Sequence, residues 1–239
     1  QPGKWVLELE DMGKTFGGKL IFRDINITVG RGEKIALLGP NGVGKSTLLK
    51  RIMGTLEGEG KVNYGHNVKV TYFAQDQAEK LDVSKTVFET VDDVAQGDIR
   101  KDLRSILGAF LFSGEDSDKK VGVLSGGERT RLALCQLLLS PSNFLILDEP
   151  TAVLTPPEVE QLITVLKKLA HKGCSILFIS HKLHEVNALC DKATILRGGK
   201  VRAERKQFAL VRRALGIAEL RPEKPAAVRM LMDTGGAAE

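Results

Sequence analysis

The sequence predicts one α/β domain over residues 1–204, with an antiparallel β edge near its start and a helical insert at about residues 78–135. Two observations indicate this fold class. A continuous apolar run at 34–38 ends in a glycine-rich loop and is followed by a helical pattern at 45–53. After residue 144, strands and helices alternate again. This alternation is typical of parallel strands joined by crossover helices.

The first elements follow from short-range patterns. Residues 5–9 and 24–29 alternate apolar and polar side chains, and the Gly17-Gly18 turn lies between them, so we expect two antiparallel strands. In the insert, apolar residues recur at helical spacing, which predicts short helices. These residues are Val87, Phe88, Val91, Leu103, Ile106, Leu107, Phe110 and Leu111.

The second half of the chain repeats the strand and helix pattern. Its short apolar runs predict buried strands, and its amphipathic stretches predict helices. We expect strands at 144–147, 175–179 and 193–196, a strand returning through 201 after Gly198-Gly199, and helices at 156–170 and 182–189. Residues 205–239 form a basic extension that is expected to be partly helical, with amphipathic spacing at 208–217.

The formal net charge of +5 lies entirely in the C-terminal segment. Residues 1–195 carry 25 basic and 25 acidic side chains, whereas residues 196–239 carry 10 and 5. Such a segment can contact phosphate backbones, but it is more often a solvated helical face, so no nucleic-acid binding is predicted. No apolar run approaches the roughly 20 residues that span a bilayer. Three widely spaced cysteines indicate free thiols, and we expect a cytoplasmic protein.

The glycine-rich loop Gly39-Pro-Asn-Gly-Val-Gly-Lys-Ser46 matches G-x-x-x-x-G-K-[ST], and it lies between a strand and a helix as phosphate-binding loops do. Glycines let backbone N–H groups turn toward a phosphate, and the helix adds its positive N-terminal end. Lys45 is expected to reach the β- and γ-phosphates, and Ser46 to supply an oxygen to Mg²⁺. The alternative is a glycine-rich turn with an incidental lysine. The residues expected to bind nucleotide here are Gly39, Asn41, Gly42, Gly44, Lys45, Ser46 and Thr47.

Two acidic residues, Asp148 and Glu149, close the apolar strand at 144–147. A carboxylate at a strand end can hold the same Mg²⁺ directly or through water, and we assign this role to Asp148. Glu149 is then placed to orient a water for in-line attack. Without the phosphate loop, such a pair would more often be a helix cap or a solvated acid.

The motif Leu124-Ser-Gly-Gly-Glu128 completes an ordered set that resembles the nucleotide-binding domain of ATP-binding-cassette (ABC) proteins, which is a P-loop NTPase fold. The resemblance implies that Phe16 stacks on adenine. It also implies that Gln75 in "YFAQDQ" senses Mg²⁺ and the γ-phosphate, and that His181 in "ILFISHK" is the switch histidine. Taken alone, Phe16 would be a packing residue and His181 a hydrogen-bonded residue at a strand end.

The resemblance also implies how the site is completed. ABC domains hydrolyse Mg²⁺-ATP as head-to-tail dimers, in which the phosphate loop of one protomer and the signature motif of the other enclose ATP. Ser125, Gly126 and Gly127 begin a helix, so they are expected to face the γ-phosphate of ATP held by a partner in a homodimer. The expected catalytic residues are Lys45, Gln75, Glu149 and His181, and the expected Mg²⁺ ligands are Ser46, Gln75 and Asp148.

The two parts of the chain resemble different groups of ABC proteins. Up to about residue 150, segments such as "LGAFLFSGEDSDKKVGVLSGGERTRLAL" look like ABC-F proteins, which act on ribosomes. From there to about residue 200, "AVLTPPEVEQLITVLKKLAHKGCSILFISHKLHEV" looks like the ATPase subunits of bacterial sugar and nucleoside importers. We therefore hypothesise a chimera joined near residues 148–154, by recombination or by design, with natural divergence as the alternative.

Thr155 stands where most ABC proteins carry an aspartate that couples the two ATP sites. Thr155, Pro156 and Glu158 fit a capping box with proline at the first helical position, so the local structure is expected to survive this exchange. The coupling carboxylate is lost. Importer subunits that resemble this half carry the same threonine, which argues against an inactive enzyme.

An ABC-type ATPase is therefore the favoured function. One alternative is a nucleotide-binding module with little or no turnover, and another is the motor subunit of a membrane importer. The physiological partner would be a membrane permease or a ribosome, and the sequence does not decide between them.

Overall fold

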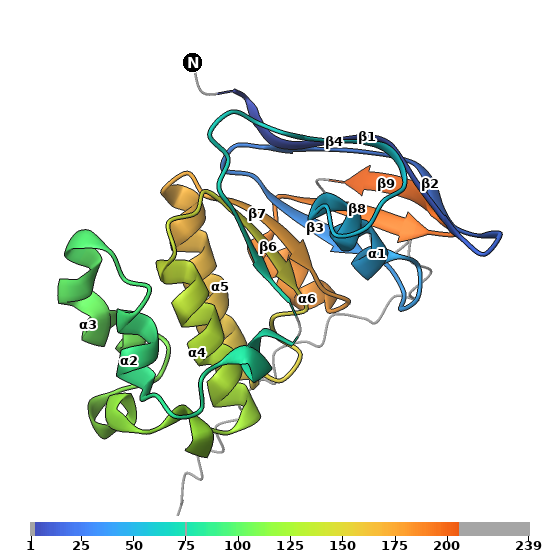
Figure 1. The fold of residues 1–239 in the computed structure, drawn as a ribbon. Helices are drawn as coiled ribbons and strands as arrows, with labels where there is room; N and C mark the ends of the chain where they lie inside the picture. Colours follow the sequence, from blue (N-terminus) through green and yellow to red (C-terminus); the bar gives the residue numbers. More distant parts are fainter. Residues whose placement is uncertain (1–2, 75, 206–239) are drawn as a thin grey trace, which may run out of the picture.

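A computed structural model describes residues 3–74 and 76–205 (Figure 1). Its strands are β1 (Trp5–Phe16), β2 (Lys19–Gly30), β3 (Lys34–Leu38), β4 (Glu59–Tyr64), β5 (Val70–Phe73), β6 (Phe144–Asp148), β7 (Ser175–Ile179), β8 (Lys192–Arg197) and β9 (Lys200–Arg205). Its α-helices are α1 (Lys45–Ile52), α2 (Val87–Asp92), α3 (Leu103–Ala109), α4 (Gly126–Leu139), α5 (Pro156–His171) and α6 (Leu183–Leu189). Short 3-10 helices lie at Gln77–Lys80, Gly97–Asp102, Gly114–Asp118 and Val121–Val123.

The strands form two sheets. Antiparallel strands in the order β2-β1-β4 make the smaller sheet, and the larger sheet has the order β5-β6-β7-β3-β8-β9. The strands from β5 to β8 run parallel, and β9 returns antiparallel to β8. This is the mixed α/β fold that the sequence predicts, an antiparallel β subdomain beside a parallel sheet with crossover helices.

Alternate side chains of the central strands point into two separate cores. In β3, Ile35 and Leu37 pack into the core between the two sheets, whereas Ala36 and Leu38 pack into the core on the helical side. Strands buried on both faces read as continuous apolar runs, which is the pattern that made these strands recognisable in the sequence. Helix α1 contributes Leu48 to the core between the sheets.

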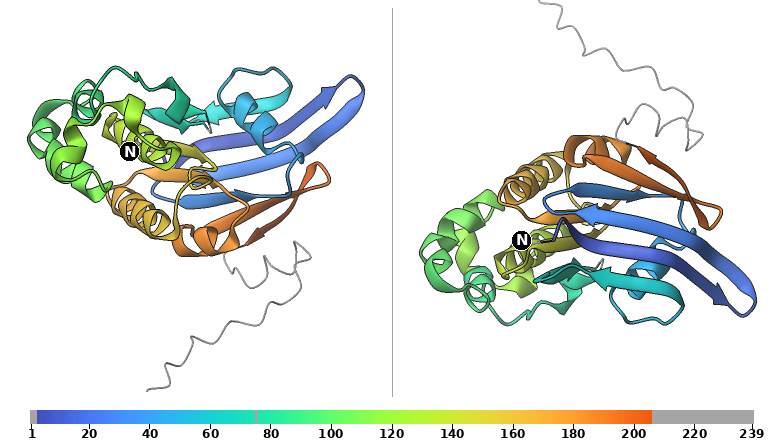
Figure 2. Two further views of the ribbon diagram at one scale, coloured as in Figure 1. Left: turned by 90° about the horizontal axis from the view of Figure 1, so that it is seen from below. Right: turned by 90° about the horizontal axis from the view of Figure 1, so that it is seen from above.

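The helical insert forms one end of the molecule, away from the tip of the β1–β2 hairpin (Figure 2). A capping box begins α2, in which the Thr86 N–H donates to Glu89 Oε2 at 2.7 Å and the Glu89 N–H donates to Thr86 Oγ1 at 3.1 Å. Val87, Leu107 and Phe112 of the insert join the same core as α4 and α5. The insert therefore packs onto α4, which is called the signature helix below because the signature motif Leu124–Glu128 lies at its start. Among the described residues, the insert has no separate core.

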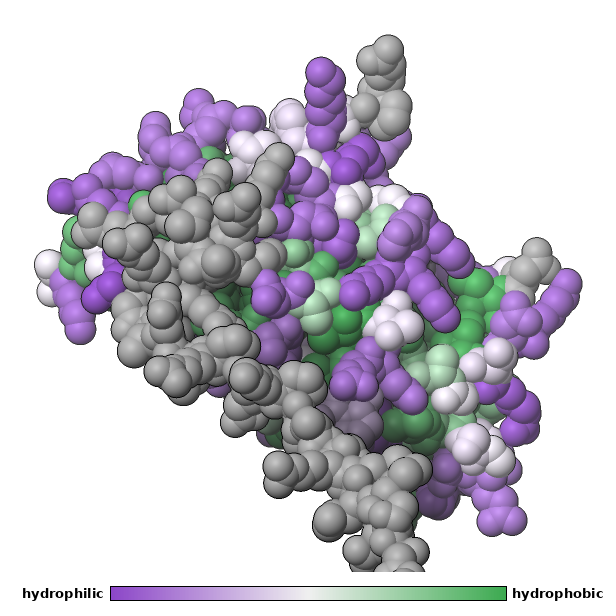
Figure 3. Space-filling model, turned by 180° about the vertical axis from the view of Figure 1, so that it is seen from behind, coloured by the Kyte–Doolittle hydropathy of each residue, from purple (hydrophilic) through white to green (hydrophobic). Residues whose placement is uncertain are grey.

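Most predicted elements lie within a few residues of their expected bounds, although β1, β2 and β9 extend further than predicted and α6 begins one residue later. The sequence did not predict β4 and β5. The expected end of the insert, residue 135, falls inside α4, and the helix expected at 208–217 lies outside the described residues. No helix within 3–74 and 76–205 is both long and apolar enough to cross a membrane. Seen from behind, hydrophilic side chains cover much of the face, with hydrophobic residues visible between them (Figure 3).

The two-sided burial of β7 gives a stability prediction. Phe178 on β7 is fully buried, so Phe178→Ala should lower the free energy of unfolding by about 3–5 kcal/mol in urea titrations. Val83 is 56% exposed, and the control Val83→Ala should change it by less than about 0.5 kcal/mol. Equal effects of the two substitutions would contradict the described core.

Candidate nucleotide-binding site

The sheet order brings the predicted site residues to one edge. Strand β7 pairs on one side with β3, where Leu37 lies opposite Ile179, and on the other side with β6, where Asp148 lies opposite Ile179. The loops that leave these three parallel strands therefore start at the same level. The phosphate loop follows β3, Glu149 follows β6 and His181 follows β7. All three therefore lie at the carboxyl ends of parallel strands, which is where open α/β sheets bind ligands.

The phosphate loop lines a cavity of about 370 Å³. Its backbone depends on glycine: Gly44 has φ +100°, and a Cβ added there would lie 2.7 Å from Ile21 Cγ2. A Cβ at Gly39 would lie 2.6 Å from the Leu196 carbonyl oxygen. The cavity is lined by Ile21, Asn41, Gly42, Gly44, Lys45, Ser46, Thr47, Asp148 and Glu149. Eight of these nine residues were predicted to bind nucleotide, Mg²⁺ or the attacking water, and only Ile21 was not predicted from the sequence.

Lys45 lies buried at the base of this loop. Its Nζ donates to the carbonyl oxygens of Gly39 at 2.6 Å and Pro40 at 3.1 Å. Burial lowers the pKa of Lys45, and the carboxylates of Glu149 and Asp148 offset part of this effect. A cation held at the wall of a cavity that a glycine-rich loop lines suits a phosphate ligand.

Asp148 is the buried carboxylate of the site. Burial raises its pKa, repulsion from Glu149 adds to the rise, and Lys45 and Tyr72 oppose it. The Tyr72 hydroxyl donates to Asp148 Oδ2 at 3.5 Å, and burial with the nearby Asp148 charge raises the pKa of Tyr72 to about 12. The phenol therefore stays a hydrogen-bond donor at neutral pH. Tyr72 is the first residue of the "YFAQDQ" motif that contains Gln75, but no pattern in the sequence pointed to its contact with Asp148.

Ser46 and Asp148 line the same cavity. A hydroxyl oxygen and one carboxylate fit Mg²⁺, because this ion is usually bound through one or two protein ligands together with substrate phosphates and water. No group of three or more His, Cys, Asp or Glu side chains is arranged to hold a metal within the described part of the chain. The donors present therefore suit a metal that arrives with a phosphate ligand.

Glu149 has a strained backbone. Its φ is +45°, in the left-handed region, where a non-glycine residue costs about 1–3 kcal/mol. Its N–H donates to the Ile179 carbonyl oxygen at 3.0 Å, and its Oε1 lies 3.3 Å from Nδ1 of His181. Because a carboxylate only accepts, this contact places the proton on Nδ1 and leaves Nε2 of His181 for another partner. Two of the four predicted catalytic side chains, Glu149 and His181, are thus in contact.

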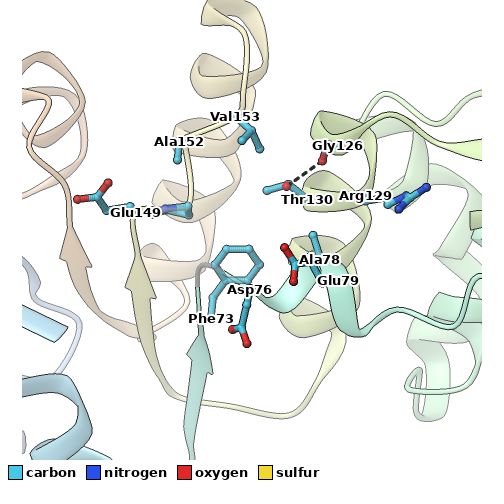
Figure 4. A pocket seen from close by; sticks show the side chains of 11 residues that line it. Phe73, Asp76, Ala78, Glu79, Gly126, Arg129, Thr130, Glu149, Ala152 and Val153 are labelled. Atoms are coloured by element: carbon cyan, nitrogen blue, oxygen red, sulfur yellow. Dashed lines mark hydrogen bonds between the residues drawn. The ribbon is translucent and has the colours of Figure 1, made fainter. Parts of the chain in front are cut away.

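The signature motif lies at a second cavity of about 550 Å³ (Figure 4). A capping box at Ser125 begins α4, in which the Ser125 N–H donates to Glu128 Oε2 at 2.7 Å. The cavity lies between α4 and the loop after β6, and the Glu149 carboxylate points away from it in Figure 4. It is lined by Phe73, Asp76, Ala78, Glu79, Gly126, Arg129, Thr130, Glu149, Pro150, Ala152 and Val153. Glu149 is the residue shared by the two cavities, whereas Gly126 lines only the second.

Among the described residues, Phe16, Gly39 and His181 were predicted for the nucleotide site but are not among those that line the phosphate-loop cavity. Phe16 ends β1 and is 47% exposed, with Lys14 Nζ 4.8 Å from its ring centroid. It is not among the described residues that line the cavity. Gln75 lies outside the described residues. The roles assigned to Phe16 and Gln75 remain predictions.

Thr155 is the N-cap of α5, with Pro156 as the first helical residue, as expected. Its N–H donates to Glu158 Oε2 at 2.6 Å. The other oxygen of Glu158 pairs with Arg131 of α4, whose guanidinium lies 5.3 Å from the centroid of the Phe112 ring. Glu158 therefore caps α5 and joins it to the signature helix.

Comparison with known proteins agrees with this geometry. A family model described as ABC transporter matches residues 22–152. The chain is 40% identical over 199 residues to "ABC transporter F family member 5" of Arabidopsis thaliana, covering 82% of this chain and 28% of that protein. It is also 40% identical over 205 residues to "ATP-binding protein Uup" of Escherichia coli K12, covering 82% and 31%. The chain spans about a third of the length of these curated relatives.

A third relative and a solved structure extend the comparison. "Energy-dependent translational throttle protein EttA" of Mycobacterium tuberculosis is 36% identical over 193 residues, covering 79% of this chain and 34% of that protein. A structure entitled "Structure of ATP binding subunit of ABC transporter" superposes with a TM-score of 0.73, covering 88% of this chain and 93% of that one. At 24% identity it supports the fold alone.

The raised pKa of Asp148 gives a prediction with a definite sign. The pKa of Asp148 is higher in the folded protein than in the unfolded chain, where it has its ordinary value of about 4. The free energy of unfolding therefore falls as the pH rises from about 4 through the pKa of the folded state, and it stays lower at higher pH. Asp148→Asn should therefore raise the Tm of the nucleotide-free protein by a few degrees at pH 7, and this gain should vanish as the pH falls toward 4.

Asp116 provides the control for this experiment. Its Oδ1 lies 2.6 Å from Lys119 Nζ on the surface, and this hydrogen bond lowers its pKa. Asp116→Asn should give no gain in Tm at pH 7. A gain for Asp148→Asn that is the same at every pH would contradict the electrostatic explanation.

Proposed function

The chain belongs to the ABC transporter family of ATP-binding domains, and from this premise we propose that it hydrolyses ATP to ADP and phosphate with Mg²⁺ as a head-to-tail homodimer. One observation carries the proposal: Lys45, Asp148, Glu149 and Ser46 line one cavity at the end of the parallel strands, and His181 contacts Glu149 there. The same cavity has the glycine-dependent loop that a triphosphate requires.

Each residue has a role that its position supports. The loop N–H groups and Lys45 bind the β- and γ-phosphates, and Ser46 with Asp148 would hold Mg²⁺. When bound, Mg²⁺ neutralises charge on the phosphate oxygens. Glu149 polarises the attacking water, and His181 uses Nε2 to position the γ-phosphate while Nδ1 contacts Glu149. Gln75 would complete the metal and γ-phosphate contacts.

The position of the signature motif supports the dimer. Gly126 at the start of α4 lines the second cavity and is not among the residues of the phosphate-loop cavity in its own chain. Val153, on the wall of the second cavity, is 57% exposed, and Val123, just before the motif, is 74% exposed. A second protomer whose nucleotide meets Ser125, Gly126 and Gly127 would cover these apolar residues.

A nucleotide-binding module with little turnover is the rival function. Positioning errors of about 1 Å can cost 10²-fold in rate, and Thr155 lacks the carboxylate that most ABC proteins have at this position. The contact between Glu149 and His181 favours turnover, because the two groups that act on water and γ-phosphate are already together.

A ribosome is the partner that the relatives favour over a membrane permease. The name of one relative, EttA, describes it as a translational throttle. Co-sedimentation of the chain with ribosomes in the presence of ATP tests this partner. The buried free thiols of Cys135, Cys174 and Cys190 support the reducing environment of the cytoplasm.

The chimeric origin stays a hypothesis. An aligned segment that covers 82% of the chain must include residues on both sides of 148–154, so the ABC-F resemblance crosses the proposed joint. Separate alignment of residues 1–147 and 155–205 decides the matter, and equal identity to ABC-F proteins in both parts would contradict a chimera.

Phosphate release provides the first functional prediction. Because composite sites form only in a dimer, specific activity with Mg²⁺-ATP should rise with protein concentration. Glu149→Gln should lower kcat by about 10²–10⁴-fold while ATP still binds, since the loop and Lys45 are unchanged. Binding of ATP without phosphate release in either protein would establish the rival function.

Complementation tests the head-to-tail arrangement directly. A Cβ added at Gly126 meets no atom within 4 Å, so Gly126→Asp should fold normally and yet repel a partner's γ-phosphate. Gly126→Asp and Glu149→Gln should each be nearly inactive. A mixture should recover up to about a quarter of the parent activity, because half of the dimers then contain one intact composite site. A mixture as inactive as its components would contradict this dimer.

A further inference from the structure

One buried carboxylate, Glu185, is not among the residues that line the nucleotide cavity. Glu185 on α6 has 0% exposure. Its Oε2 accepts hydrogen bonds from Thr151 Oγ1 at 2.7 Å and from Ser180 Oγ at 2.9 Å. Thr151 belongs to the loop after β6, whereas Ser180 belongs to the loop after β7. One carboxylate oxygen therefore joins two loops that leave neighbouring strands.

Lys182 ties the same loops a second time. Its Nζ donates to the Thr151 carbonyl oxygen at 3.0 Å and lies 3.3 Å from Glu185 Oε1. Its N–H donates to Ser180 Oγ at 3.0 Å. The hydroxyl of Ser180 therefore both donates to Glu185 and accepts from the backbone of its own loop. The side chains of Thr151, Ser180, Lys182 and Glu185 are called the Glu185 cluster below.

Members of the Glu185 cluster lie close in sequence to two of the predicted catalytic residues, Glu149 and His181. Thr151 follows Glu149 by two positions, and Ser180 directly precedes His181. Glu149 is strained at φ +45°, and its carbonyl oxygen accepts from the N–H of Ala152 within the same tight turn. A strained residue persists only where its surroundings over-determine the backbone. The Glu185 cluster supplies such constraint through hydrogen bonds to the loops that follow β6 and β7.

The chemistry of the cluster argues against simple space filling. A buried carboxylate is costly to desolvate, and a packed apolar group of similar size often stabilises a fold as well or better. What an apolar group does not supply is direction: the two hydroxyl donors fix both loops relative to Oε2 of Glu185, and the Lys182 ammonium forms an ion pair at Oε1.

We propose that Glu185 is a positioning residue for ATP hydrolysis, which holds the Glu149 loop and the His181 loop in one relative arrangement through Thr151, Ser180 and Lys182. The proposal rests on the proposed function. In this role Glu185 contacts neither nucleotide nor metal. Loss of the hydrogen bonds to Glu185 should therefore lower kcat and leave the affinity for ATP almost unchanged. In the proposed enzyme, Glu185 sets the separation between the group that polarises water and the group that positions the γ-phosphate.

The experiment compares three threonine variants. Thr151→Val removes the hydroxyl at constant shape, Thr151→Ser keeps it, and Thr90→Val is the matched control. Thr90 is 3% exposed, and its hydroxyl donates to the Thr86 carbonyl oxygen at 2.8 Å inside the helical insert. Thr151→Val should lower kcat at least about tenfold with the Kd for ATP within about twofold. Thr151→Ser should retain kcat, and Thr90→Val should lose stability without losing kcat.

A second readout does not depend on turnover. The Ala152 N–H donates to the Glu149 carbonyl oxygen at 3.1 Å, and the Leu154 N–H to the Thr151 carbonyl oxygen at 3.3 Å. In the nucleotide-free protein, Thr151→Val should accelerate hydrogen exchange of these two amides at least about tenfold, whereas Thr90→Val should not. If the parent protein shows no turnover, the proposed function fails, and the exchange rates still decide whether the cluster positions the loop.

Two outcomes would overturn the proposal. One is parent-like kcat and loop exchange in Thr151→Val, which would leave the Glu185 cluster with a role in stability alone. The other is a loss of kcat and of ATP affinity that is as large in the control Thr90→Val as in Thr151→Val. Should Thr151→Val fail to fold, Ser180→Ala removes the other hydroxyl donor to Glu185 and is judged by the same two readouts.

Discussion

The position of β7 between β3 and β6 is the constraint on which the whole site depends. Ile179 pairs with Leu37 on one side and with Asp148 on the other, so the phosphate loop, Glu149 and His181 leave the sheet at the same level. The order is fixed from both faces, because alternate residues of these strands pack into two separate cores. Another strand order would separate Lys45 from Asp148, which now line one cavity. The chemistry of the site is thus a consequence of hydrophobic burial some distance below it.

The same arrangement concentrates unfavourable features at the strand ends. Lys45 and Asp148 are both buried, burial shifts the pKa of each toward its neutral form, and Glu149 is held in a left-handed conformation. Natural proteins retain such features chiefly at functional sites, because the rest of the fold compensates for them. Here the compensation includes the bond from the Glu149 N–H to Ile179 and the hydrogen bonds around Glu185.

The sequence predicts those elements whose position in the fold leaves a pattern in a short stretch of residues. The runs of β3, β6 and β7 are continuous because both faces are buried, and the phosphate loop has a spacing that its backbone geometry requires. Strands β4 and β5 escaped prediction because β4 is a largely polar strand that pairs only with β1, and β5 has four residues. Thr151 and Glu185 are 34 positions apart in the sequence, and their contact depends on how α6 packs, so no local pattern predicts it. Tyr72 reaches the site because β5 pairs with β6, and Ile21 reaches it because the two sheets pack against each other, so neither contact follows from a local pattern.

Glu149 lines both the phosphate-loop cavity and the cavity beside the start of α4. The segment that follows it is anchored at its far end by Glu158, which caps α5 through the Thr155 N–H and pairs with Arg131 of the signature helix. Arg131 in turn lies against Phe112 of the insert. The segment between Glu149 and Thr155 is therefore fixed to β7 and Glu185 at one end and to α4 at the other. A displacement of the signature helix has to be absorbed within these few residues or transmitted to Glu149. The loop after β6 is therefore held between β7 and α4, and the link between α5 and α4 is made by Glu158 rather than by the side chain at position 155.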